Sequence, residues 1–179
     1  YMKILVLTNL YPPYSVSEYE VRCATVTDQF REKGHQVHVL TSNHGLPKKS
    51  ASQTSTDLTI NPERQEKHIS RALRLHGHFG HPWLGISKLK HLELYNNEAL
   101  QDTLHRYKPE IVHVWNMAGL SKSLLLTLQK SGIPVVYDVA DFWIARSLKW
   151  DVWLRWWNRR DISKINKVRR WFAQAFGNR

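Results

Sequence analysis

The sequence predicts an α/β protein with a doubly wound parallel sheet, and two observations lead to this prediction. Short continuous apolar runs, of which residues 4–7 are the first, are typical of strands that are buried on both faces. These runs alternate with longer segments of helical periodicity and with loops at glycines, as in βαβ units. The chain has 179 residues, of which 42% are hydrophobic, so it can bury the core of one such Rossmann-like domain.

The first βαβ unit is expected as a strand at residues 4–7, a helix at 18–33 and a strand at 37–40. In the helical segment, apolar side chains recur every three or four residues and would form one buried stripe: Tyr19, Cys23, Val26 and Phe30. Gly34 follows the helix and is expected as its C-terminal cap, because glycine readily adopts the left-handed backbone conformation that is common there.

The same alternation continues through the second half of the chain. Two polar segments, 43–66 and 76–85, lack periodicity and are expected as loops. Around them the apolar pattern predicts further elements, with strands at 69–75, 111–115 and 133–137 and helices at 86–107 and 120–130.

We place the Rossmann-like domain at residues 1–148 and treat residues 149–179 as a separate basic, tryptophan-rich segment that is expected to be helical. The chain carries 26 Lys and Arg against 15 Asp and Glu, a formal net charge of +11. The final segment is basic and suits either an acidic membrane surface or packing against further parts of the protein. No nucleic-acid-binding motif accompanies it, so nucleic acid is not expected as a partner.

The single cysteine, Cys23, excludes an internal disulfide bond and fits a reducing compartment. No run reaches the roughly 18 apolar residues of a membrane-spanning helix. The sequence enters a strand at once, without the pattern of a signal peptide. We therefore expect a cytoplasmic protein, with peripheral contact between residues 149–179 and the inner face of the membrane as an open alternative.

A parallel α/β sheet binds its ligand at the carboxyl ends of its strands, and the first loop there covers residues 8–20. The loop leads into a helix whose free N–H groups and positive dipole end could hold a phosphate. We therefore predict that this loop supplies four substrate-binding residues, Asn9, Tyr11, Ser17 and Glu18. The alternative is an ordinary loop in which Ser17 caps the helix, because the glycines of a phosphate-binding loop are missing.

Five segments, taken in order, resemble family 4 glycosyltransferases. Residues 2–13 and 34–41 are similar to the opening of these enzymes, with a strand, a Tyr-Pro-Pro loop and a Gly-His step into the second strand. Residues 108–114 (KPEIVHV) resemble the family's KPDVVHVH-type strand. Residues 132–136 (GIPVV), followed by Asp-Phe-Trp at 141–143, resemble its GIPVV…HDxW segment.

The resemblance implies a GT-B fold, in which two Rossmann-like domains face each other across a cleft. The first domain of this fold mainly binds the acceptor, and the second binds the nucleotide-sugar and carries a Glu-x7-Glu motif. Nothing after residue 143 resembles the second domain, so the chain is expected to be the acceptor-binding N-terminal half, with its missing C-terminal domain as a partner. The full-length protein would transfer a hexose from a nucleotide-sugar, expected to be UDP-linked, to a saccharide or lipid-linked acceptor with retention of configuration, whereas this chain alone is expected to be inactive.

The sequence departs from the family pattern at two places. Where the family has Gly-Gly before the first helix, this chain has Ser17-Glu18, and Glu18 would bring bulk and negative charge toward a diphosphate. The family's frequent His before the Asp of HDxW aligns with Ala140, so the role of that histidine cannot be carried over. Both departures favour the alternative function, a non-catalytic basic module that binds a membrane surface or a partner protein.

Two later strand ends supply the other candidate residues. Asp138 and Asp141 are predicted to be catalytic, because a carboxylate there could orient the acceptor hydroxyl or take its proton. The alternatives are a structural role for Asp138 and a helix cap for Asp141. For Trp115 and Asn116 the alternatives are a core side chain and a turn. Aromatic faces and amides suit sugars, so substrate contacts are predicted for Trp115, Asn116, Phe142 and Trp143.

The histidines at positions 76, 78 and 81 suggest a zinc site at first sight. A structural zinc site needs four ligands, however, and Cys23 lies in the apolar stripe of the first helix. We therefore expect no metal and interpret this segment as a loop over the acceptor groove. No cofactor is expected either, because the nucleotide-sugar donor is itself a substrate.

Overall fold

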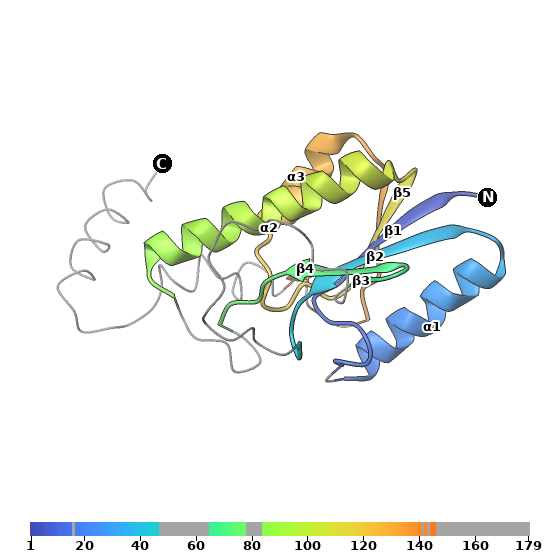
Figure 1. Ribbon diagram of the computed structural model, residues 1–179, viewed down its shortest axis with the longest axis horizontal. Helices are drawn as coiled ribbons and strands as arrows, with labels where there is room; N and C mark the ends of the chain where they lie inside the picture. The colour runs from blue at the N-terminus through green and yellow to red at the C-terminus, as the bar shows by residue number, and fades with distance from the viewer. Residues whose placement is uncertain (16, 47–64, 78–83, 141, 143, 146–179) are drawn as a thin grey trace.

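The computed structural model describes residues 1–15, 17–46, 65–77, 84–140, 142 and 144–145. In this part of the chain, strands form one sheet in the order β3-β4-β2-β1-β5-β6 (Figure 1). The strands are β1 (Lys3–Leu7), β2 (Gln36–Ser42), β3 (Gln65–Glu66), β4 (Ile69–Leu73), β5 (Ile111–Val114) and β6 (Val135–Tyr137). The helices are α1 (Glu18–Glu32), α2 (Ile86–Tyr107) and α3 (Ser123–Ser131).

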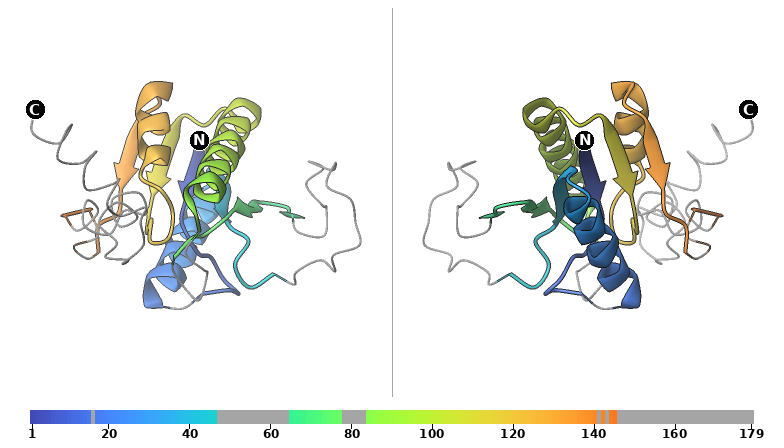
Figure 2. Two further views of the ribbon diagram at one scale, coloured as in Figure 1. Left: turned by 90° about the vertical axis from the view of Figure 1, so that its left-hand side faces the viewer. Right: turned by 90° about the vertical axis from the view of Figure 1, so that its right-hand side faces the viewer.

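The sheet is parallel except for β3, which pairs antiparallel with β4 at the edge. The central strand, β1, pairs with β2 on one side and with β5 on the other. Helix α1 covers one face of the sheet, and α2 and α3 cover the other (Figure 1, Figure 2). This is a doubly wound, Rossmann-like arrangement, so the predicted fold class is confirmed.

Both faces of β1 are buried, which explains the continuous apolar run at its position. Leu5 and Leu7 belong to the core under α2 and α3, whereas Ile4 and Val6 belong to the core under α1. Successive side chains of a strand point to opposite faces, so one apolar run serves both cores. Helix α1 packs on its core through the stripe that its periodicity predicts: Tyr19, Cys23, Val26 and Phe30.

The two ends of α1 follow from its sequence. At the C-terminal end, Gly34 adopts a φ of +87° and donates its N–H to the Arg31 carbonyl at 2.8 Å, as expected of a capping glycine. At the N-terminal end, Ser17 and Glu20 form a capping box. The Ser17 N–H donates to the Glu20 carboxylate at 2.7 Å, and the Ser17 hydroxyl accepts the Tyr19 N–H at 3.3 Å. The first turn of α1 is therefore fixed beside the carboxyl ends of the strands.

A few element bounds differ from the prediction. Strand β3 lies at the end of the segment 43–66, which was expected to be a loop throughout. Helix α3 begins at Ser123 instead of residue 120. Strand β6 begins at Val135, because the preceding Pro134 has no N–H to donate to a ladder. None of these differences changes the predicted topology. The segment 149–179 lies outside the described residues, and its division from the domain stays a prediction.

Two leucines of α3 offer a matched test of which face of this helix is buried. Leu124 is fully buried in the core under α2 and α3, whereas Leu126 is 59% exposed. Leu124→Ala should lower the free energy of unfolding by about 2–5 kcal/mol, because it removes buried methyl groups and leaves a cavity. Leu126→Ala should change it by less than about 0.5 kcal/mol. Urea unfolding measures both values, and equal losses would contradict the packing described here.

Candidate functional site

Asn9 fastens the loop after β1 to the neighbouring strand ends. Its N–H donates to the Asn116 carbonyl at 2.8 Å, and its carbonyl accepts the Ser42 N–H at 3.2 Å. The side-chain Nδ2 donates to the Ala118 carbonyl at 3.0 Å, and Oδ1 accepts the Leu10 N–H at 2.8 Å. Asn9 is fully buried, so this predicted substrate contact presents no surface to a ligand and holds three strand ends together instead.

Arg71 of β4 holds the next part of the same loop. Its Nη1 donates to the Tyr11 carbonyl at 3.0 Å, and its Nη2 donates to the Pro12 carbonyl. The guanidinium also lies over the ring of Tyr14, 5.2 Å from its centroid. Arg71 is buried, and so is Tyr11, another predicted substrate contact. Sequence reasoning missed Arg71, although a lone arginine inside an apolar strand was the available signal.

The first turn of α1 carries negative rather than positive charge. Ser17 is engaged in the capping box, so the alternative that it caps the helix is confirmed. Glu18 is exposed, and Glu20 is buried against the Ser17 N–H. These two carboxylates lie at the positive end of the helix dipole and stabilise it themselves. A phosphate placed there would meet like charge, so this helix end by itself does not fit a diphosphate.

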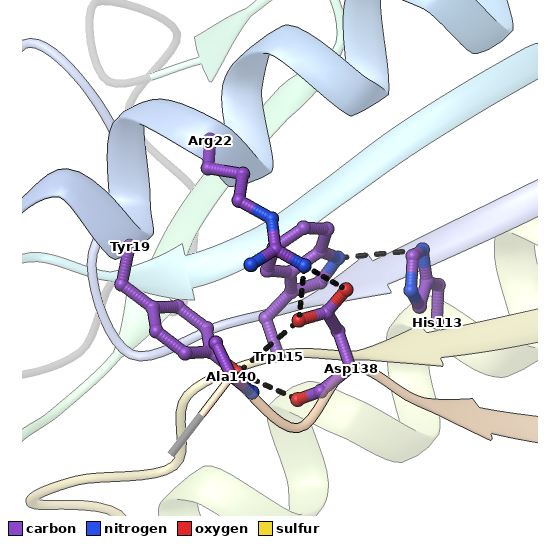
Figure 3. Close-up of polar contacts among 6 residues, drawn as sticks. All are labelled: Tyr19, Arg22, His113, Trp115, Asp138 and Ala140. Carbon is purple, nitrogen blue, oxygen red and sulfur yellow. Dashed lines mark hydrogen bonds and ion pairs between the residues drawn. The ribbon is translucent and has the colours of Figure 1, made fainter.

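Asp138, at the carboxyl end of β6, joins that strand to α1 (Figure 3). Its two carboxylate oxygens accept from Arg22 Nη2 at 3.2 and 3.1 Å. The Tyr19 hydroxyl donates to the Asp138 carbonyl at 2.6 Å and accepts the Ala140 N–H at 3.3 Å. The Asp138 side chain is 19% exposed and that of Arg22 is 55% exposed. Arg22 holds its carboxylate and Tyr19 holds its carbonyl, so Asp138 positions the chain after β6, and its catalytic role stays a prediction.

Trp115 lies beneath this cluster and supports it. Its ring meets Tyr19 edge to face at a centroid distance of 5.6 Å, and the Arg22 guanidinium lies 5.6 Å from the ring centroid (Figure 3). The indole N–H donates to His113 Nδ1 at 3.3 Å. Burial lowers the pKa of His113, and the nearby charge of Asp138 opposes this shift. Trp115 is fully buried, so the structure places it in the core and leaves no ring face for a sugar.

The remaining candidates lie nearer the surface. Asn116 is partly exposed, and its Oδ1 accepts the Ala118 N–H at 2.9 Å in a tight turn. Phe142 is 70% exposed and Val139 is 50% exposed, so the chain after β6 presents apolar surface beside Asp138. The predicted catalytic Asp141 and the predicted contact Trp143 lie outside the residues that the structure describes.

At the carboxyl ends of the strands, the buried residues hold the loops in place, and the more exposed residues lie around them. We call Arg22, Asn116 and Phe142 the rim of the site. The amide of Asn116, the partly exposed guanidinium of Arg22 and the ring of Phe142 can meet a ligand that is both polar and ring-shaped. The described charged groups around the rim are net negative, because Arg22 is balanced by Asp138 and the first turn of α1 adds the carboxylates of Glu18 and Glu20. This chemistry suits hydroxyl groups better than a diphosphate.

His76 has a structural place in the described part of the histidine-rich segment. It is buried, its N–H donates to the Gly119 carbonyl at 3.1 Å, and its Nε2 accepts the Leu84 N–H at 3.3 Å. It therefore ties residues 84–85 to the turn after β5. Among the described residues, no three His, Cys, Asp or Glu side chains gather as metal ligands. His78 and His81 lie outside the described residues.

The fold and the strand-end loops define a Rossmann-like α/β domain of the kind found in GT-B proteins. The sequence model of Glycosyltransferase Family 4 matches residues 19–175, most of the chain. The chain therefore belongs to Glycosyltransferase Family 4, which confirms the resemblance seen in its sequence.

One curated protein is similar to most of this chain. The chain is 21% identical over 156 residues to a protein of Klebsiella pneumoniae described as an uncharacterized 42.6 kDa protein in the cps region. The match covers 80% of this chain but 38% of that relative, so the chain spans well under half of the relative's length. In the described part of the chain, no helix is both long enough and apolar enough to cross a membrane.

The lowered pKa of His113 predicts how the stability of the folded protein depends on pH. This pKa is lowered in the folded protein, whereas an unfolded histidine titrates near about 6.5. Below that value the unfolded chain binds more protons, so the free energy of unfolding should fall as the pH drops from about 7.5 to about 5.5. His113→Gln should make this decline shallower. Denaturant unfolding at a series of pH values measures it, with the exposed His91→Gln as control, and an unchanged slope in His113→Gln would refute the expectation.

Proposed function

We propose that this chain is the acceptor-side domain of a retaining glycosyltransferase, which moves a hexose from a UDP-linked sugar to a saccharide or lipid-linked acceptor. The observation that carries the proposal is the family match over residues 19–175, which covers α1 from its second residue and the loops after β5 and β6. The net negative charge of the described groups at these loops supports an acceptor rather than a donor role, because the donor carries a diphosphate. The diphosphate of the donor needs cationic and N–H groups, and we assign these to a further domain of the whole protein.

In this proposal the residues at the strand ends divide into two groups. Asn116 and Phe142 contact the acceptor, because an amide bonds hydroxyl groups and an aromatic ring packs on a sugar. Asp141 and Trp143 flank Phe142 in the sequence, and Asp141 orients the acceptor hydroxyl. The second group holds the first in place: Asn9 and Arg71 fix the loop after β1, and Arg22, Tyr19 and Asp138 fix the chain after β6.

The alternative is a module without catalytic activity that binds a membrane surface or a partner protein. Two observations favour it: the carboxylates in the first turn of α1, and Ala140 in place of the family's histidine. On this alternative the basic residues of 149–179 would supply the contact. It also predicts no turnover of a nucleotide-sugar by the complete gene product.

The experiment that separates these readings compares this chain with the product of the complete gene. Each is incubated with UDP-glucose, UDP-galactose and UDP-N-acetylglucosamine, and release of UDP is followed with and without saccharide acceptors. We expect UDP release from the complete protein and none from the chain of 179 residues. If the complete protein binds and turns over no nucleotide-sugar, the glycosyltransferase proposal fails and the binding-module alternative gains.

Variants of the complete protein test the assigned roles. Asp141→Asn should lower kcat by about 100-fold or more, because a positioned acid or base contributes about that much. Phe142→Ala should mainly raise KM for the acceptor. Asp28→Asn, on α1 with a side chain that is 63% exposed, is the matched control and should keep the wild-type rate. Wild-type kcat in Asp141→Asn would remove this residue from the mechanism.

A further inference from the structure

A cavity lies on the other face of the sheet and shares no lining residue with the site around Asp138. It has a volume of about 580 Å³ and lies between α2 and the strands β2 and β4. This volume falls within the range of small-molecule sites. Ala72 of β4 and Ala99 of α2 are among the residues that line it, and these small side chains leave the space open.

The cavity opens along the flank of α2 that is turned away from α3. The opposite flank is occupied, because Asn97 of α2 bonds to Ser123 and Thr127 of α3 at 3.0 and 2.6 Å. Only α2 among the described helices lies beside β2 and β4 on this face. The result is a wedge-shaped space between α2 and the edge of the sheet, lined by side chains of the helix and of the strands.

Polar groups line two sides of this wedge. On α2, Glu98, Asp102 and Arg106 recur at intervals of four residues, and Asp102 accepts from Arg106 at 2.9 Å. On the strands, Ser70 is almost fully buried and His38 is half-buried. Donors and acceptors therefore face the same space from opposite walls, as a ligand with several hydroxyl groups requires.

Aromatic rings supply flat apolar surface between the polar groups. The rings of His38 and Tyr107 lie 5.2 Å apart at 38° to each other. Burial lowers the pKa of His38 and raises the pKa of Tyr107 to about 12, so both rings are neutral near pH 7. At the other end, Tyr95 lines the cavity, and the guanidinium of Arg74 lies 3.7 Å from its ring centroid.

The net charge of the residues that line the cavity favours some classes of ligand over others. Glu98 and Asp102 against Arg106 leave one net negative charge, in a chain whose total is +11. A phosphate or nucleotide would be repelled by the unbalanced carboxylate. A purely apolar ligand would displace the water around these charged groups and offer no hydrogen bonds in place of those that the water made. A neutral ring with hydroxyl groups satisfies both the aromatic surfaces and the polar walls.

We propose that the cavity between α2 and the strands β2 and β4 is a saccharide-binding site for a neutral disaccharide or trisaccharide. One sugar ring lies against His38 and Tyr107, and its hydroxyl groups bond to Glu98 and Ser70. The Asp102–Arg106 pair offers an acceptor and a planar set of donors to a second ring. This site stands independently of the proposed transfer reaction, because it binds a saccharide and carries out no chemistry on it.

The test is a titration of the 179-residue chain, with the alanine methyl groups labelled for NMR. Lactose, maltose, cellobiose and mannobiose are added to about 20 mM, a range that detects dissociation constants weaker than 1 mM. UDP and inorganic phosphate are added in parallel. We expect at least one disaccharide to shift the Ala72 and Ala99 signals, and UDP and phosphate to leave them unmoved.

Two variants show whether the shifts come from this cavity. Glu98→Gln should weaken binding by about fivefold through loss of a charge-assisted hydrogen bond, whereas the exposed Glu32→Gln should bind as the wild type does. Ala99→Leu should abolish binding by filling the space. The proposal is overturned if no disaccharide moves the Ala72 and Ala99 signals, if phosphate alone moves them, or if Glu98→Gln binds with unchanged affinity. The exposed position of Glu98 keeps the test valid even if Ala99→Leu fails to fold.

Discussion

The burial of β1 on both faces is the constraint on which the rest of the structure depends. Leu5 and Leu7 pack under α2 and α3 while Ile4 and Val6 pack under α1, so the central strand joins the two cores. Its parallel pairing with β2 and β5 brings three strand ends to the same edge of the sheet. Asn9, the second residue after β1, then uses every one of its polar groups to hold that edge together.

The same edge of the sheet explains why some residues of the candidate site are buried and held in place while others stay at the surface. Trp115 meets Tyr19 edge to face and lies beneath the Arg22 guanidinium, and Asp138 of the chain after β6 pairs with Arg22. The described charged groups near the surface are net negative, because Arg22 is balanced by Asp138 and Glu18 and Glu20 add two carboxylates. Such a surface favours hydroxyl-bearing ligands over phosphates.

The charge of the chain is unevenly divided between its surfaces. The total of +11 suggests attraction to anions everywhere, yet the first turn of α1 and the outer flank of α2 both carry carboxylates. Placing Glu18 and Glu20 at the start of α1 stabilises the helix dipole, and placing Glu98 and Asp102 along α2 makes a polar wall beside the sheet. Net charge is therefore a poor guide to what each of these surfaces binds.

The sequence by itself determined the order and type of the main elements, because apolar runs and helical periodicity are local properties, as the run at 4–7 and the stripe of α1 illustrate. It also predicted a site at the carboxyl ends of the strands, which stays a prediction, and it offered Ser17 as a helix cap, which the structure confirms. Only the tertiary structure decided that Trp115 and Asn9 are buried and that Arg22 binds Asp138. It alone brought Arg71 to the loop after β1. These outcomes depend on which side chains meet across the sheet, and residues 60 to 119 positions apart in sequence share no local pattern.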